Sequence, residues 1–201
     1  MSALDFISLT RLAPSDLRPL LEAGVEPRAT DLIGWEFRGW NVLAPIARPF
    51  MAALGFQRFA KGFFSRAPEG AASDESPDFE GYNLMITAGS VDDPWVLRDP
   101  APHSFYRAER VGAPRTKPDL HPHALLLDYA LGDPRPPLFE GGPLWGNGGI
   151  FDFLVHPSPG SRDLLLGVAY YSLPPIRVLG GYFVAERWRR AEATVPPPSR
   201  R

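Results

Sequence analysis

The chain contains no cysteine, and only two of its basic residues, Lys61 and Lys117, are lysines. The absence of cysteine excludes thiol catalysis, disulfide bonds, and zinc or iron–sulfur sites ligated by cysteine. The formal net charge is only −2, so no overall field attracts nucleic acid or an anionic membrane. We therefore expect neither nucleic acid nor a membrane surface as a partner.

Long apolar runs are missing as well. No stretch approaches the roughly 18 apolar residues of a membrane-spanning helix. The first residues lack the basic start of a secretion signal, and Asp5 interrupts their apolar run. These features predict a soluble cytoplasmic protein without a membrane span.

The composition favours one domain rich in turns. A chain of 201 residues is long enough for one well-buried core and short for two. It contains 19 glycines and 24 prolines, about a fifth of the chain and below the roughly 25–30% typical of disordered sequences. Such a content favours many short strands joined by turns over a bundle of helices.

Three regions follow from the pattern along the chain. Residues 1–30 are predicted to form a helix and connector, because Leu17, Leu20 and Leu21 have the spacing of one helical face. Residues 31–190 form the predicted β-domain. Residues 191–201 are rich in proline and arginine, and we expect a disordered tail there. The oligomeric state stays open.

Alternating apolar and polar residues dominate the central region. A short helix over 42–54, kinked by Pro45 and Pro49, is expected after the first strand. The alternation, punctuated by proline, glycine and aspartate, predicts strands at 32–40, 56–64, 79–88, 95–98, 104–110, 124–131, 149–156, 163–172 and 177–187.

Closure of the sheet follows from its last strand. Residues 177–187 are aromatic and carry almost no charge before Glu186, so both edges of this strand are expected to be paired. The strand over 32–40 is its natural partner. The predicted fold is mainly β: a closed antiparallel barrel of about 8–10 strands.

Three segments resemble the calycin superfamily of lipocalin-like barrels, and within it small bacterial barrel proteins of uncharacterised function. They are Trp35-Glu-Phe-Arg-Gly39, which is similar to a Gly-x-Trp-x-Gly first strand, and the closing pair 164–170 and 181–187. The resemblance implies that Arg187 stacks over an aromatic ring at the barrel base and bonds carbonyls of the N-terminal segment. Trp35 and Phe37 are both candidates for that ring.

Common catalytic motifs are absent: the sequence has no Gly-x-Ser-x-Gly, P-loop, Gly-x-Gly-x-x-Gly or His-Glu-x-x-His. His121 and His123 could both reach one metal from an extended segment, but no third ligand is identifiable. We favour a polar loop here, with His123 as a pocket residue, and expect no metal or other cofactor and assign no catalytic residue.

Polar residues within apolar strands are the main candidates for a site. Asp128 and Asp152 share strand faces with aliphatic residues, so each either faces solvent or pairs inside with Arg98, Arg107 or Arg177. One residue of the pair Tyr170–Tyr171 must face inward in a closed barrel. The predicted ligand-binding residues are Trp35, Phe37, Tyr82, Tyr106, His123, Asp128, Asp152, Tyr170 and Tyr182.

Three functions are compatible with this pattern. The leading hypothesis is a non-enzymatic barrel that holds a small hydrophobic or amphipathic ligand. The alternative is an enzyme of isomerase or decarboxylase type acting on a small aromatic or lipid-like acid, as calycin-like barrels also include; an inward aspartate beside a tyrosine favours it. The third is an interaction module with a filled core.

Overall fold

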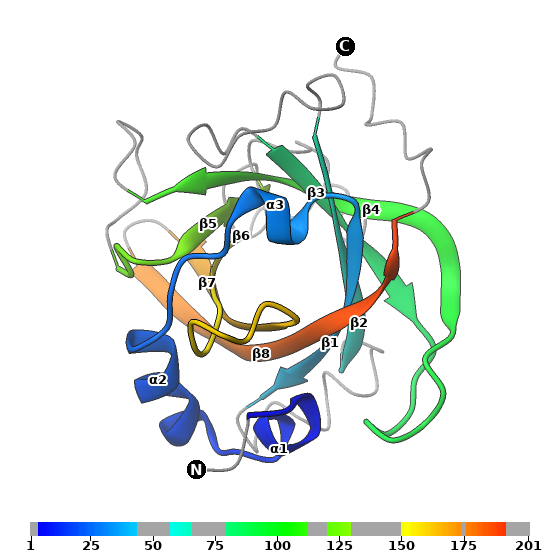
Figure 1. Ribbon diagram of the computed structural model, residues 1–201, viewed down its shortest axis with the longest axis horizontal. Coiled ribbons are helices and arrows are strands. Elements are labelled where there is room, and N and C mark those ends of the chain that lie inside the picture. Colours follow the sequence, from blue (N-terminus) through cyan, green and yellow to red (C-terminus); the bar gives the residue numbers. More distant parts are fainter. Residues whose placement is uncertain are drawn as a thin grey trace.

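The computed structural model describes residues 4–43, 57–65, 79–111, 120–129, 150–173 and 176–191. Within them, strands form one closed antiparallel barrel in which each strand pairs with the next (Figure 1). The strands are β1 (Trp35–Val42), β2 (Arg58–Ser65), β3 (Phe79–Ile86), β4 (Leu97–Arg110), β5 (Leu125–Asp128), β6 (Ile150–Val155), β7 (Leu164–Leu173) and β8 (Ile176–Arg190).

The predicted closure is confirmed. β8 pairs antiparallel with β1 along the whole of β1, from Trp35 opposite Arg190 to Val42 opposite Tyr182. Most of the predicted helix over 42–54, and nearly all of the predicted tail over 191–201, lie outside the described residues. The mainly β barrel of the sequence prediction is therefore the observed fold.

One pair of predicted strands is a single strand. Residues 97–98 of the first range and all of 104–110 belong to β4, which continues through Pro100 and Pro102. β4 pairs irregularly with β3 here, and β5 pairs only with 107–110. A proline costs a strand little where no ladder hydrogen bond needs its N–H, so these prolines do not end β4.

Short helices precede the barrel: α1 (Phe6–Thr10), α2 (Pro14–Glu22) and α3 (Ala29–Leu32). The predicted helix is α2, but it begins at Pro14, so Pro19 lies in its interior and removes one backbone hydrogen bond. Burial of Leu17 and Leu21 offsets that loss. None of the described helices has the length and apolar character needed to cross a membrane.

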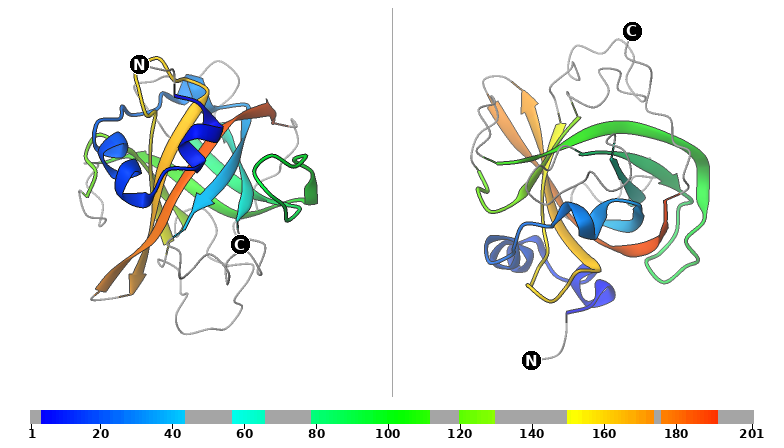
Figure 2. Two further views of the ribbon diagram at one scale, coloured as in Figure 1. Left: turned by 90° about the horizontal axis from the view of Figure 1, so that it is seen from below. Right: turned by 45° about the horizontal axis from the view of Figure 1, so that its top comes forward.

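The helices cover the barrel in two ways. Figure 1 shows α1 and α2 outside the wall and α3 across one end. The β7–β8 hairpin extends beyond the wall at the other end (Figure 2), where Val178 and Leu179 are exposed. An apolar layer lies between the helices α1 and α2 and the outer face of the barrel. Phe6, Leu9, Leu17 and Leu21 of the helices pack there against Phe153, Val155, Leu166, Val168 and Val184 of the strands.

The lumen has its own apolar cluster. Phe37 and Phe63 meet edge to face at 5.8 Å between ring centroids, and Phe79 packs on Phe63 at 6.0 Å. Leu32 of α3 is fully buried against this cluster. The end of the barrel under α3 is therefore filled by apolar side chains.

Arg187 ties α3 to the wall at this end. Its guanidinium lies 4.6 Å from the ring of Trp35 and 5.8 Å from that of Phe37. It donates a hydrogen bond to the carbonyl of Asp31 at 2.8 Å and pairs with Asp163 at 3.0 Å. Both candidate rings thus lie beside Arg187, and Trp35 is the nearer.

Replacing Arg187 with alanine is expected to destabilise the fold. The stacking and the charged hydrogen bond together contribute about 2–3 kcal/mol. Denaturant unfolding measures the loss, with Arg18→Ala as control, because Arg18 forms an exposed pair with Glu22 and such pairs contribute less than about 0.5 kcal/mol. Equal stability of the two variants would show that Arg187 does not fasten α3.

Candidate functional site

The side chain of Lys61 is buried inside the barrel. It lies in β2 between Phe59 and Phe63, and alternation along the strand places all three on the lumen face. Its side chain is only 4% exposed. A lysine so fully buried needs partners for its charge.

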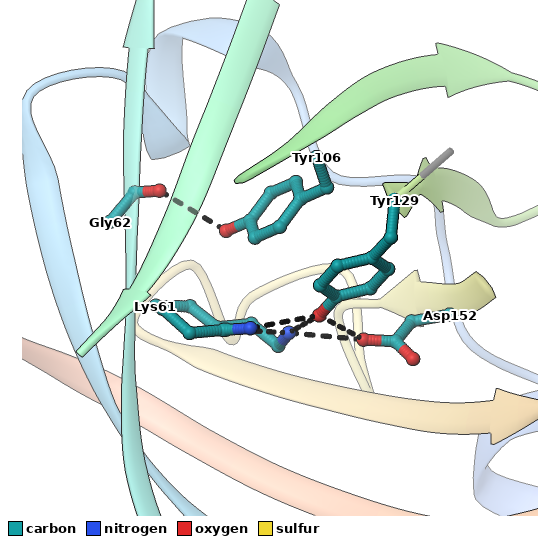
Figure 3. Close-up of polar contacts among 6 residues, drawn as sticks. Lys61, Gly62, Tyr106, Tyr129 and Asp152 are labelled. Carbon is teal, nitrogen blue, oxygen red and sulfur yellow. Dashed lines mark hydrogen bonds and ion pairs between the residues drawn. The ribbon is translucent and has the colours of Figure 1, made fainter. Parts of the chain in front are cut away.

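Three acceptors surround the Lys61 ammonium, one for each N–H. They are Asp152 Oδ2 at 3.0 Å, Asn83 Oδ1 at 3.1 Å and the Tyr129 hydroxyl at 2.5 Å. Figure 3 shows Lys61 of β2, Asp152 of β6 and Tyr129, which directly follows β5, converging on one point. The ion pair with Asp152 is shielded from solvent, because the side chain of Asp152 is only 5% exposed.

Tyr129 connects the other groups. Its hydroxyl accepts from Lys61 and from Asn83 Nδ2 at 3.3 Å, and donates to Asp152 Oδ2 at 2.9 Å. Donors and acceptors therefore match throughout the group. Lys61, Asn83, Tyr129 and Asp152 are called the lumen cluster below.

Aromatic rings enclose the ammonium. The Lys61 nitrogen lies 5.0–5.5 Å from four ring centroids, within the range of cation–π attraction. The rings belong to Phe59, Tyr106, Tyr129 and Phe183. The charge thus stands among apolar walls, away from solvent.

Glycines let three of these rings lie against the wall. A Cβ at each glycine would fall within 2.0–2.3 Å of a ring carbon, so only glycine fits beneath the ring. The pairs are Phe59 over Gly39, Tyr106 over Gly81 and Phe183 over Gly167. The hydroxyl of Tyr106 is fixed by donation to the carbonyl of Gly62 at 3.1 Å (Figure 3).

Burial changes the acidity of these groups in opposite directions. Desolvation lowers the pKa of Lys61, and the nearby charge of Asp152 partly opposes this change. Desolvation raises the pKa of Tyr129 well above its usual value, and Asp152 raises it further. Tyr129 therefore keeps its proton, whereas Lys61 gives up its proton more readily than an exposed lysine does.

His103 lies beside the lumen cluster, opposite Asn83 in the β3–β4 pairing. Burial lowers the pKa of its imidazole, and the charge of Lys61 lowers it further, so the ring is neutral at pH 7. Nδ1 lies 3.0 Å from the Ser104 hydroxyl. Nε2 is buried and has no hydrogen-bond partner among the described residues.

Four predicted ligand-binding residues belong to the lumen or its covered end. Phe37, Tyr106 and Asp152 face the lumen, and Trp35 lies at the end under α3 between Arg187 and Arg190. The sequence allows Asp152 either to face solvent or to pair inside the barrel, and in the structure it faces inward and is paired. Its partner is Lys61, not one of the three arginines considered.

Five others face outward: Tyr82, His123, Asp128, Tyr170 and Tyr182. Tyr82 donates to Glu36 at 2.9 Å on the outer wall, and Asp128 lies opposite Arg107. Tyr182 joins the apolar layer under α1 and α2. Strand alternation alone does not reveal which of its two faces is the inner one, so the sequence does not separate these residues from the lumen residues.

The outward histidines belong to the helix-covered wall. His123 Nε2 lies 2.9 Å from the carbonyl of Leu21, and His121 Nε2 lies 3.1 Å from the hydroxyl of Tyr170. The described part of the chain contains no group of three or more metal-ligating side chains.

Of the pair Tyr170–Tyr171, Tyr171 is the residue that faces inward, on the same face of the sheet as Asp152. Burial raises the pKa of the Tyr171 hydroxyl.

Sequence analysis missed Lys61, Asn83 and Tyr129 as members of one group. A signal for Lys61 was present: a rare lysine with phenylalanines two residues away on each side, Phe59 and Phe63, shares their face. Tyr129 likewise alternates with Leu125 and Leu127. The distances between strands, which bring these residues together, have no local signature.

Comparisons of the chain with protein-family models, with curated proteins and with solved structures gave no match. The closed antiparallel barrel is compatible with a calycin-like fold.

Removing one member of the buried ion pair is expected to cost more than removing both. Lys61→Met leaves Asp152 charged and unpaired, which costs about 3–5 kcal/mol. The double variant Lys61→Met with Asp152→Leu recovers most of that loss, since apolar residues of similar volume replace the pair and Tyr129 keeps Asn83 as a partner. Denaturant unfolding of the three proteins measures the difference; a double variant as unstable as the single would contradict it.

Proposed function

We propose that the protein binds one small amphipathic molecule inside the barrel, with the polar end of that molecule at the lumen cluster. The observation that carries the proposal is the dry Lys61–Asp152 pair within walls of aromatic rings. A few polar groups converging among apolar side chains are the usual composition of a small-molecule site.

Energetics supports a functional reason for this pair. A buried ion pair contributes no more to stability than apolar residues that fill the same space, and often less. A barrel serving only as a scaffold gains nothing from Lys61 at this place. Buried titratable groups with shifted pKa values cluster at functional sites, because acids, bases and nucleophiles need pKa values matched to their task.

The lumen is polar in one part and apolar in another. Asn83 of β3, Tyr129 directly after β5 and Asp152 of β6 lie further from α3 than the apolar residues of the same segments. Those apolar residues are Phe79, Leu125 and Leu154. Within the described residues, Asp152 uses only Oδ2, and His103 Nε2 has no partner. Asp152 Oδ1 and His103 Nε2 are therefore the atoms that meet the polar end of the molecule.

Lipocalin-like identity belongs to the same proposal. The resemblance of 181–187 to a calycin closing strand is supported by the position of Arg187, which bonds the carbonyl of Asp31 and stacks beside Trp35. A cytoplasmic container for a small apolar or amphipathic compound is the function that this family membership implies.

A second candidate is an enzyme on the same barrel. Asp152 is an inward carboxylate hydrogen-bonded to a tyrosine, which is the arrangement expected of an acid and base pair. Lys61, with its lowered pKa, adds an amine. Chemical change of a bound molecule, as opposed to its release intact, distinguishes this candidate from a container.

Binding is tested by isothermal titration with two unreactive probes, 2-naphthalenemethanol and decanol. We expect one of them to bind with one-to-one stoichiometry. Ala169 lies opposite Asp152 on the lumen face, so Ala169→Phe fills the proposed site and weakens binding by at least about tenfold, or 1.4 kcal/mol. Native mass spectrometry of the purified protein looks for a molecule already bound.

Leu179→Phe is the control, because Leu179 is exposed on the β7–β8 hairpin. It adds the same ring outside the lumen and leaves binding unchanged. Absence of binding by both alcohols, or an equal loss in the two variants, would exclude a site in the lumen. Far-ultraviolet circular dichroism confirms that each variant is folded.

A further inference from the structure

Lys61 is placed to do more than hold a charge. Each of its three N–H groups already has an acceptor in the lumen cluster, so a molecule that enters finds no free donor on the ammonium. The amine engages such a molecule either by giving up a hydrogen bond or by forming a covalent bond to it. The neighbouring carboxylate and phenol favour the second course.

We propose that Lys61 forms a reversible Schiff base with the carbonyl carbon of an aldehyde or ketone bound in the barrel. This inference rests on the proposed function and names its ligand class: carbonyl compounds with an aromatic or aliphatic body. Lysine amines in apolar surroundings react with carbonyl groups in this way.

The reaction balances without any further reagent. The ammonium passes one proton to Asp152, and the neutral amine attacks the carbonyl carbon, forming a C–N bond. The carbonyl oxygen takes one proton from the attacking nitrogen and a second from Asp152, and leaves as water when the C–O bond breaks. The net change is ammonium plus carbonyl to protonated imine plus water.

Charge within the lumen is the same before and after. A protonated imine replaces the ammonium, and Asp152, 3.0 Å from the Lys61 nitrogen, is a carboxylate at both stages. The buried counter-ion therefore has a cation to face throughout. No uncompensated charge remains in the apolar interior, which would cost several kcal/mol.

Tyr129 and Asn83 supply donors to the oxygen. While Asp152 holds the proton it needs no hydrogen bond from Tyr129, so the phenol O–H, 2.9 Å away at rest, is free to turn to the carbonyl oxygen. Asn83 Nδ2 lies 3.3 Å from the same hydroxyl and adds a second donor. Donors aimed at a developing oxyanion lower the barrier to attack.

The walls favour the product. Water hydrolyses imines, and the rings around Lys61 exclude it from the nitrogen. The lowered pKa of Lys61 also increases the fraction of neutral amine at pH 7 above that of an exposed lysine. Both effects act on Lys61 specifically.

Reductive trapping tests the inference. The full chain is incubated with 2-naphthaldehyde or decanal and cyanoborohydride at pH 7, and the adduct is located by peptide mass spectrometry. We expect one modified site, Lys61, and protection by an excess of the matched alcohol. Lys117→Arg retains the adduct, because Lys61 is then the only lysine; Lys61→Arg and Lys61→Met lose it.

The possible results separate the two proposals. If an alcohol binds one-to-one but the aldehyde labels only Lys117 or the N-terminal amine, the Schiff base is excluded and the binding site remains. If neither alcohol binds and Lys61 is unlabelled, both are excluded. Labelling of Lys61 that the alcohol does not compete with shows a reactive amine without a binding site, and contradicts the inference as stated.

A matched pair of variants tests the part played by the phenol. Tyr129 and Tyr82 each donate to a carboxylate at 2.9 Å, but Tyr82 does so on the outer wall. Tyr129→Phe is expected to slow trapping about 100-fold, in the range of general acid catalysis, while Tyr82→Phe leaves the rate within a factor of about two. Equal rates in both variants would remove Tyr129 from the reaction.

Discussion

The pairing of β1 with β8 is the constraint on which the rest of the molecule depends. Without it the sheet has two free edges and no inside, and the face that carries Phe37, Lys61 and Asp152 is exposed to water. Closure turns that face into a lumen and allows α1 and α2 to cover the other. Arg187 then joins the last strand to the backbone at Asp31, so that closure and the covered end are held by the same residue.

Seclusion of Lys61 follows from closure. Residues of β2, β3, β4, β6 and β8 reach its ammonium, because the lumen is narrow enough for side chains to meet across it. The same burial keeps water from the ammonium, lowers the pKa of Lys61, and makes Asp152 necessary as the partner of the ammonium charge. The aromatic rings and the ion pair therefore belong together. The rings shield the Lys61 ammonium from solvent, and the shielded ammonium needs the Asp152 carboxylate as its counter-ion.

Local pattern predicts the barrel and its closing strand because alternation and turn residues act over a few positions. It does not reveal which face of each strand is inner, and so Tyr82 and Tyr182 were grouped with Tyr106 although they face the other way. The sequence marks Asp152 as a candidate, but it suggests arginines as the partner. The observed partner, Lys61, lies 91 positions earlier in the chain, and only the strand order and register bring the two together.

The glycines under the rings make the wall itself a determinant of selectivity. Phe183 lies flat only because Gly167 has no side chain, so one methyl group there would tilt the ring toward the centre. The inner diameter is therefore set in part by glycines that need not touch a ligand themselves. In evolution, exchange of glycine for alanine at such positions offers a way to change the preferred size of the guest while the chemistry around Lys61 stays intact.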